Sequence, residues 1–282
     1  MEAKTLVGDV KIPVLGIGTW GMGGRYERDT SHDKEEILAI KTAIKLGMTH
    51  IDTAEVYGKG HAEELVAQAI QGFDRKKLFI VTKVSQEHLR HDDIMSAAKA
   101  SLKRLKTNYI DLYLIHGPNP SIPLKETMKA MDHLAEKKLV RFIGVSNFSV
   151  KEMKEAQSYT KNKIVANQIE YNLLIRNKGM WTTNMESEII PYCQKNNIII
   201  IAYRPIAKGE LAKPGYKLLD ELAKKYNKTQ AQIAINWLIL KKNIVTIPKS
   251  TDINHLKENL GAIGWKMDSE DIKKLDQFKA KH

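Results

Sequence analysis

Short apolar runs alternate with amphipathic segments along almost the whole chain, and this alternation constrains the fold more than any other feature. The runs are rich in β-branched residues: VLGIGT, THID, LFIVTK, YIDLYLIH, RFIGVS, IVANQIE, IIIIAY and NIVTIP. The segments between them have helical spacing, as in Ile37, Ile40 and Ile44. Repeated strand-then-helix units predict a parallel sheet that helices cover on its outer face.

Eight such units favour a closed (β/α)8 TIM barrel over an open, doubly wound sheet. An open dinucleotide-binding sheet is expected to carry G-x-G-x-x-G between its first strand and first helix. The glycine-rich segment GIGTWGMGGR has no such spacing leading into a helix. The open sheet is therefore the second choice.

Two elements lie outside the repeat. The segments KTLVG and KIPVL, around Gly8 and Asp9, predict an N-terminal β-hairpin, and DSEDIKKLDQF predicts an extra C-terminal helix. Within the repeat, Ser149 with Glu152 and Thr229 with Gln232 have the spacing of capping boxes at helix starts. No linker or low-complexity tract divides the chain, so we expect one domain over residues 1–282.

Composition narrows the classes of partner. Lys and Arg number 45 against 33 Asp and Glu, a net charge of +12 that would suit a nucleic-acid partner. The basic residues are interleaved with acids along amphipathic segments, which indicates solvated helix faces and no nucleic-acid partner. With a single cysteine, Cys193, no N-terminal apolar stretch and no apolar run longer than residues 198–203, we expect a cytoplasmic protein without a membrane segment. The oligomeric state has no signature in the sequence.

Polar residues follow most of the apolar runs. The carboxyl ends of all strands in a (β/α)8 barrel open onto one rim, so residues scattered along the chain converge there. The residues that follow the strands are Asp52, Lys83, His116, Asn147, Gln168, Tyr203 and Lys249.

Four residues suit proton transfer to a carbonyl group. A tyrosine hydroxyl such as that of Tyr57 is a poor acid at neutral pH, and an ammonium beside it lowers its pKa. Lys83 supplies that ammonium and Asp52 a carboxylate to orient it, while His116 can donate a hydrogen bond to the substrate oxygen. Taken singly, each residue has an ordinary explanation: a turn cap, a packing aromatic or a strand end.

Other chemistries find less support. The remaining histidines show no metal-ligand spacing and the lone cysteine offers no thiolate pair, so we expect no metal site; they include His50, His61, His88, His91, His133 and His255. No G-x-S-x-G marks a hydrolase nucleophile. A Schiff-base barrel enzyme using Lys83 fits the fold but leaves Tyr57 without a role.

The chain resembles the aldo-keto reductase family, in a form with a short C-terminal loop. The resemblance rests on GIGTW, IDTAEVYG, VTKV, DLYLIHGP, RFIGVSNF, NQIEYNLL, AYRPIAKGEL and IPKS, which occur in order over almost the whole chain. It implies NAD(P)H-dependent reduction of aldehydes or ketones. In this assignment Asp52, Tyr57, Lys83 and His116 form the catalytic tetrad, and Tyr57 is the general acid in reduction and the base in oxidation.

The resemblance also implies a nicotinamide cofactor bound across the rim without a Rossmann fold. Ser146, Asn147 and Gln168 match positions that hydrogen-bond the carboxamide, and Tyr203 matches the aromatic ring that stacks on the nicotinamide. Lys249 and Ser250 match the clamp for the 2′-phosphate, which favours NADP(H). The full expected cofactor set is Gly18, Thr19, Trp20, Asp52, Ser146, Asn147, Gln168, Tyr203, Arg204, Pro205, Ile206, Lys249, Ser250, His255, Glu258 and Asn259.

The chain departs from the family pattern at two of these positions. His255 stands where an arginine is usual, and an imidazole cannot both stack on adenine and bind a phosphate bidentately, so NAD(H) is a second possible cofactor. Arg204 stands where serine is common, and it either binds the pyrophosphate or pairs with an acid on the rim.

The substrate pocket has less distinct signals. Trp20 and Trp181 are candidates for an apolar pocket wall or for ordinary packing. The sequence ends soon after its last predicted helix, from which we expect a comparatively open pocket.

A regulatory module is the alternative to an enzyme, because proteins resembling this family, such as potassium-channel β subunits, bind NADP while serving a partner protein. The intact tetrad favours the enzyme, with a small aldehyde, ketone or alcohol as its partner.

Overall fold

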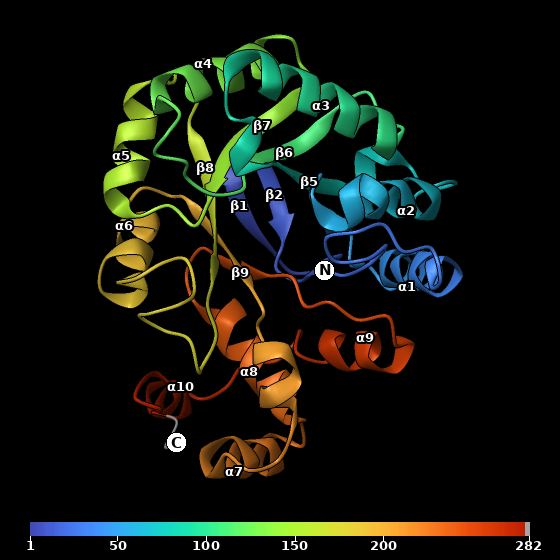
Figure 1. Cartoon of the computed structure of the whole chain (residues 1–282). Coiled ribbons are helices and arrows are strands. Elements are labelled where there is room, and N and C mark those ends of the chain that lie inside the picture. The colour runs from blue at the N-terminus through green and yellow to red at the C-terminus, as the bar shows by residue number, and fades with distance from the viewer. Residues whose placement is uncertain (280–282) are drawn as a thin grey trace.

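Eight parallel strands form the centre of the structure. The computed structural model describes residues 1–279, and the end of the chain at residues 280–282 lies outside the described part. The strands neighbour one another in chain order, and a bridge between Leu15 and Thr246 joins the first strand to the last. Helices surround this sheet (Figure 1), so the predicted (β/α)8 barrel is confirmed.

All eight predicted strands are present. The barrel strands are β3 (Gly16–Gly18), β4 (His50–Asp52), β5 (Phe79–Val84), β6 (Ile110–Ile115), β7 (Val140–Ser146), β8 (Ile164–Glu170), β9 (Ile199–Tyr203) and β10 (Ile244–Thr246). The α-helices are α1 (Asp33–Lys45), α2 (His61–Ala69), α3 (His91–Leu105), α4 (Leu124–Glu136), α5 (Val150–Ser158), α6 (Ile190–Lys195), α7 (Lys217–Tyr226), α8 (Gln230–Leu240), α9 (Ile253–Leu260) and α10 (Ser269–Asp276). Shorter helical turns are η1 (Tyr57–Gly60), η2 (Arg75–Lys77), η3 (Gln86–His88), η4 (Met185–Ile189, a π-helix) and η5 (Ala207–Ala212).

The predicted elements outside the repeat are also confirmed. Strands β1 (Ala3–Val7) and β2 (Val10–Pro13) form an antiparallel hairpin, and α10 is the predicted final helix. Both capping boxes are formed, at Ser149 before α5 and at Thr229 before α8.

Alternation along the strands divides the apolar core into two parts. Outward residues of the strands pack against the helices in the larger cluster. Inward residues, such as Leu112 and Ile201, form a second cluster inside the barrel, which also contains Leu6 and Ile12 of the hairpin. The hairpin therefore covers the amino-terminal end of the barrel and leaves the opposite rim to its loops.

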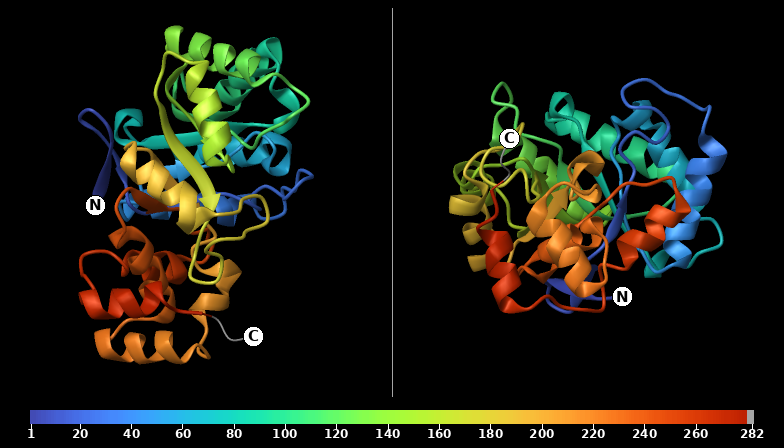
Figure 2. Two further views of the ribbon diagram at one scale, coloured as in Figure 1. Left: turned by 90° about the vertical axis from the view of Figure 1, so that its left-hand side faces the viewer. Right: turned by 90° about the horizontal axis from the view of Figure 1, so that it is seen from below.

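Two loops extend on the side of the molecule away from the hairpin. They follow β3 and β8 and are the blue and yellow loops in the left view of Figure 2.

Within residues 1–279, no helix is both long enough and apolar enough to cross a membrane.

Candidate active site

Strand periodicity places three polar residues inside the barrel. Successive side chains of a strand point to opposite faces, so a residue two positions after a core residue points inward again. Lys83 follows Val81 of the inner cluster by two positions, and His116 follows Leu114 in the same way. Asp52 ends β4 and is 2% exposed.

Tyr57 comes from the loop between β4 and α2. It begins η1, and the following Gly58 has a φ of +54°. A Cβ at Gly58 would lie 2.0 Å from the carbonyl oxygen of Gly23, so only glycine fits between the two loops. This close approach holds Tyr57 at the rim, where its side chain is 7% exposed.

A buried chain of polar contacts joins Asp52, Lys83 and Tyr57. The Lys83 ammonium lies 2.6 Å from Oδ1 of Asp52 and 3.2 Å from the Tyr57 hydroxyl oxygen. Its third contact is the carbonyl oxygen of Thr53, at 2.8 Å. All three donors of the ammonium are therefore satisfied, as a fully buried lysine requires.

Burial, rather than Lys83, decides the protonation of Tyr57. Burial raises the pKa of the Tyr57 hydroxyl above its ordinary value, and the Lys83 ammonium, which lowers that pKa, offsets only part of the effect. The expectation that Lys83 brings this pKa below its usual range is therefore wrong in its net direction. Tyr57 is protonated at neutral pH, as a proton donor must be.

Lys83 remains a cation in spite of its burial. Burial alone would lower its pKa, but the Asp52 carboxylate and the Tyr57 hydroxyl raise it above the usual value. The ammonium therefore stays beside the tyrosine throughout the neutral range.

His116 is neutral in this site. Burial, together with the Lys83 ammonium, lowers the pKa of its imidazole to about 3. Its ring contacts that of Tyr57 edge-on, with 5.7 Å between centroids. A neutral imidazole can donate one hydrogen bond toward an oxygen held beside the Tyr57 hydroxyl.

The residues expected at the carboxamide are also gathered at the rim. Gln168 donates to Oδ2 of Asp52 at 2.7 Å, and Ser146 donates to the carbonyl oxygen of Gln168 at 3.0 Å. Asn147 contacts Ser146 Oγ and accepts from the Tyr203 hydroxyl at 3.2 Å. These amides and hydroxyls therefore form one connected polar group beside the tetrad.

Arg204 pairs with an acid on the rim, which is one of its two expected roles. Its guanidinium Nη1 lies 3.0 Å from Oε1 of Glu170, the last residue of β8. Arg204 has a φ of +53°, an unusual conformation for a residue with a side chain. The side-chain amide of Asn172 donates a hydrogen bond of 2.9 Å to the carbonyl oxygen of Arg204. Arg204 also lowers the pKa of Tyr57 slightly, as the last of several causes.

The expected phosphate clamp lies where β10 leads into α9. Lys249 is exposed, and no acidic group within residues 1–279 pairs with its ammonium. The Ser250 hydroxyl, by contrast, donates to the carbonyl oxygen of Asp252 and accepts from the backbone N–H of the same residue. Of the two, Lys249 has the free donor, which fits the chemistry of a 2′-phosphate.

Helix α9 carries the rest of the expected adenine contacts. His255 is exposed, Glu258 is half-buried and Asn259 is buried. The structure places all three on one short helix after Lys249, separate from the tetrad residues inside the barrel.

The remaining expected contacts follow β3 and β9. Gly18 donates to the carbonyl oxygen of Pro248, and Thr19 donates to that of Asp52. The Trp20 ring contacts the Tyr57 ring edge-on, with 5.0 Å between the ring centroids. Pro205 is buried and Ile206 half-buried, directly after Arg204.

Three contributors to the site were not singled out from the sequence. Thr53 contributes its backbone carbonyl oxygen, which the type of its side chain does not indicate. Tyr26, whose ring lies 5.5 Å from that of Trp20, comes from an irregular loop. Glu170 was detectable, because it is the next inward position of β8 after Gln168.

In the described part of the chain, no group of three His, Cys, Asp or Glu residues could hold a metal ion.

Comparisons with known proteins identify the family of the chain. The model of the Aldo/keto reductase family matches residues 14–280. The chain belongs to this family. It is accordingly an NAD(P)H-dependent oxidoreductase.

Two curated relatives and two solved structures show how far the similarity extends. Methylglyoxal reductase YeaE of Escherichia coli is 35% identical over 96% of this chain and 92% of its own length. Glyoxal reductase of Bacillus subtilis is 32% identical over 95% and 89%. The thermostable aldo-keto reductase Tm1743, solved with the inhibitor epalrestat, is 45% identical with a TM-score of 0.92 over 98% of this chain and 99% of its own. An aldo-keto reductase from Klebsiella pneumoniae in complex with NADPH is 32% identical, with a TM-score of 0.86 over 98% and 95%.

Proposed function

We propose that this protein reduces a small aldehyde or ketone to an alcohol and that Tyr57 donates the proton to the carbonyl oxygen. The buried contact between the Tyr57 hydroxyl and the Lys83 ammonium, at 3.2 Å, carries the proposal. It joins a protonated hydroxyl to a cation that stabilises the phenolate left after proton transfer. The neutral imidazole of His116 orients the carbonyl oxygen toward the same hydroxyl.

The proposed cofactor is NADP(H), whose nicotinamide supplies the hydride. Ser146, Asn147 and Gln168 would hold the carboxamide, and the exposed ammonium of Lys249 would hold the 2′-phosphate. The Klebsiella pneumoniae neighbour solved with NADPH supports this choice. Since His255 cannot provide a guanidinium, use of NAD(H) as a second cofactor is part of the proposal.

The test combines NADPH, a reactive aldehyde such as 4-nitrobenzaldehyde, and the Tyr57→Phe variant. We expect the wild type to consume NADPH and Tyr57→Phe to lose roughly 10²- to 10⁴-fold in kcat, the usual contribution of a general acid. Tyr113→Phe is the matched control, because Tyr113 is also buried but its hydroxyl has no partner in the described structure. Methylglyoxal belongs in the substrate panel because a relative is named for it.

Two outcomes would count against the proposal. Equal rates for wild type and Tyr57→Phe would remove Tyr57 as proton donor. Tight NADPH retention with negligible turnover on every carbonyl compound would favour the regulatory binding module instead.

A further inference from the structure

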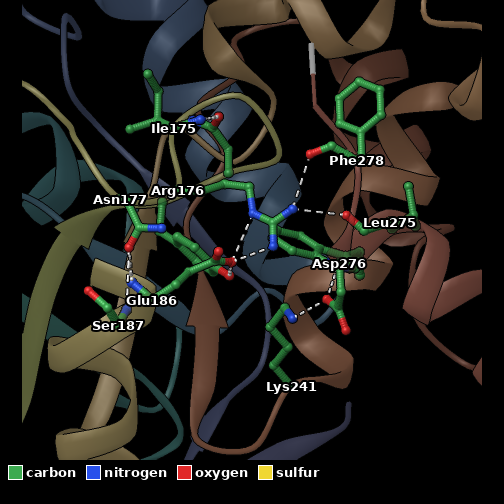
Figure 3. A network of polar contacts seen from close by, with 12 residues as sticks. Ile175, Arg176, Asn177, Glu186, Ser187, Lys241, Leu275, Asp276 and Phe278 are labelled. Carbon is green, nitrogen blue, oxygen red and sulfur yellow. Dashed lines mark hydrogen bonds and ion pairs between the residues drawn. The ribbon is translucent and has the colours of Figure 1, made fainter. Parts of the chain in front are cut away.

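The loop between β8 and η4, residues 171–184, is fixed at its base by one arginine. Arg176 contacts Oε1 of Glu186 through both Nε, at 2.9 Å, and Nη2, at 2.8 Å. Its Nη1 donates to the carbonyl oxygens of Leu275 and Phe278, at 3.1 and 3.2 Å. Figure 3 shows the guanidinium between the acid and the C-terminal helix, so Arg176 binds the loop to the end of α10.

Further contacts hold both ends of the loop. Oε1 of Glu186 also accepts from the Tyr171 hydroxyl at 2.6 Å, at the point where the chain leaves β8. The side chain of Asn177 accepts from the backbone of Glu186 and Ser187. Glu186 lies in the π-helical turn η4, a kind of irregularity that is frequent at functional sites.

The far part of the loop is a small hairpin with an apolar tip. Lys178 and Thr183 form an antiparallel bridge, and Gly179 donates to the carbonyl oxygen of Thr182 at 2.8 Å. Between them, Met180 and Trp181 are 65% and 63% exposed. A firmly anchored loop therefore presents two large apolar side chains to solvent.

Gly179, at the start of the tip, lies against the rim that carries the active site. A Cβ built on Gly179 would be 3.6 Å from Oε2 of Glu170, the residue that pairs with Arg204 directly after Tyr203. In the left view of Figure 2 the yellow loop extends on the side opposite the N-terminal hairpin. Gly179, which directly precedes Met180 and Trp181, therefore lies beside Glu170 at the carboxyl end of β8.

We propose that Met180 and Trp181 form an apolar wall that selects carbonyl substrates with an aromatic or bulky alkyl group. This inference rests on the proposed function and names the substrate class of that site. Because the base of the loop is held rigidly, the tip presents its apolar surface without first becoming ordered. Little binding free energy is therefore lost to ordering of the loop when a substrate binds. The Trp181 ring supplies most of the surface for stacking.

The test compares a bulky aldehyde with a small one in the Trp181→Ala variant. An aromatic contact contributes about 0.5–1.5 kcal/mol, so the KM for 4-nitrobenzaldehyde should rise about 2- to 10-fold. The KM for propanal should rise less, because a short alkyl chain covers little of the ring. Trp181→Phe should restore most of the preference for the aromatic aldehyde, whereas a purely structural role would lower the Tm in both variants.

Controls separate this inference from the proposed function. Tyr159→Ala removes another exposed aromatic side chain, at the end of α5, and should leave the ratio of the two KM values as in the wild type. Arg176→Met releases the loop base and should weaken the preference as Trp181→Ala does. An unchanged KM ratio in an active Trp181→Ala enzyme overturns the inference alone. A wild type that reduces neither aldehyde overturns the proposed function, and the inference with it.

Discussion

Gln168 donates a hydrogen bond of 2.7 Å to Oδ2 of Asp52, the carboxylate oxygen opposite the one that holds Lys83. Asp52 ends β4 and Gln168 lies in β8, four strands further round the barrel. The contact therefore crosses the interior of the barrel. It fixes the carboxylate from the far side and so fixes the position of the ammonium beside Tyr57.

Replacing Gln168 with leucine should destabilise the protein even before any effect on activity. The change leaves a buried carboxylate oxygen of Asp52 without its donor, at a cost of about 1–3 kcal/mol in the free energy of unfolding. Urea unfolding followed by circular dichroism measures this loss. Gln194→Leu is the matched control, since Gln194 lies in α6 with its side-chain contact at the surface. Equal stability of the two variants would show that Gln168 does not hold the carboxylate.

The sequence predicted the barrel and the proximity of three polar residues for the same reason. Each apolar run marks a strand, and the closed barrel brings the residues that follow the strands to one rim. Asp52, Lys83 and His116 were located in this way, and all three lie together in the structure. The prediction that these residues lie close together came from the (β/α)8 architecture, because no single residue indicates it.

Contacts across the barrel could not be predicted in the same way. The bond from Gln168 to Asp52 and the pair of Arg204 with Glu170 depend on which inward side chains meet across the closed interior. That meeting depends on strand tilt and register, which no local pattern encodes. The net pKa direction of Tyr57 was mistaken for a related reason, because the depth of burial is a property of the whole fold.

The raised pKa of Tyr57 predicts opposite pH profiles for the two directions of the reaction. Carbonyl reduction needs the protonated hydroxyl, so its kcat/KM should be nearly constant from about pH 6 to pH 9 and fall only above the ordinary tyrosine pKa of about 10. His116, with a pKa of about 3, adds no change in this range. Alcohol oxidation needs the phenolate, so its rate should rise with pH over the same range.

Initial rates in both directions, in buffers of constant ionic strength, check this prediction. Lys83→Met removes the ammonium that lowers the pKa of Tyr57, so the rise of the oxidation rate should move to higher pH. A reduction rate that falls tenfold between about pH 6 and pH 9 would contradict the assignment, because Tyr57 would then lose its proton in the neutral range.

Lys249→Ala should weaken NADPH binding much more than NADH binding. A hydrogen bond to a charged group contributes about 1.5–3 kcal/mol, so the Kd of NADPH should rise roughly 10- to 100-fold while that of NADH changes little. Titrations followed by nicotinamide fluorescence give both constants. Lys257→Ala removes a neighbouring exposed lysine of α9 and serves as control. Equal losses for the two cofactors would argue against a contact between Lys249 and the 2′-phosphate.

His50 should make the stability of the protein depend on pH. It begins β4 inside the barrel, is 0% exposed, and its ring nitrogens form no well-aligned hydrogen bond in the described structure. Burial lowers the pKa of its imidazole from 6.5 to about 4; the nearby Lys83 also lowers it, and Asp52 and the Pro13 carbonyl offset part of the shift. The unfolded chain therefore takes up a proton near pH 6.5, whereas the folded protein does so only near pH 4.

As the pH falls from about 6.5 to about 4, this difference favours the unfolded state. At about 1.4 kcal/mol per pKa unit, the loss amounts to about 3 kcal/mol in the free energy of unfolding. His50→Leu removes the titrating group, so the difference in stability between pH 7 and pH 4, measured by urea unfolding, should shrink by about that amount. His32→Leu, at an exposed site, should keep the pH dependence of the wild type. If the His50 and His32 variants lose stability in parallel with the wild type as the pH falls, the buried imidazole is not the group that takes up the proton.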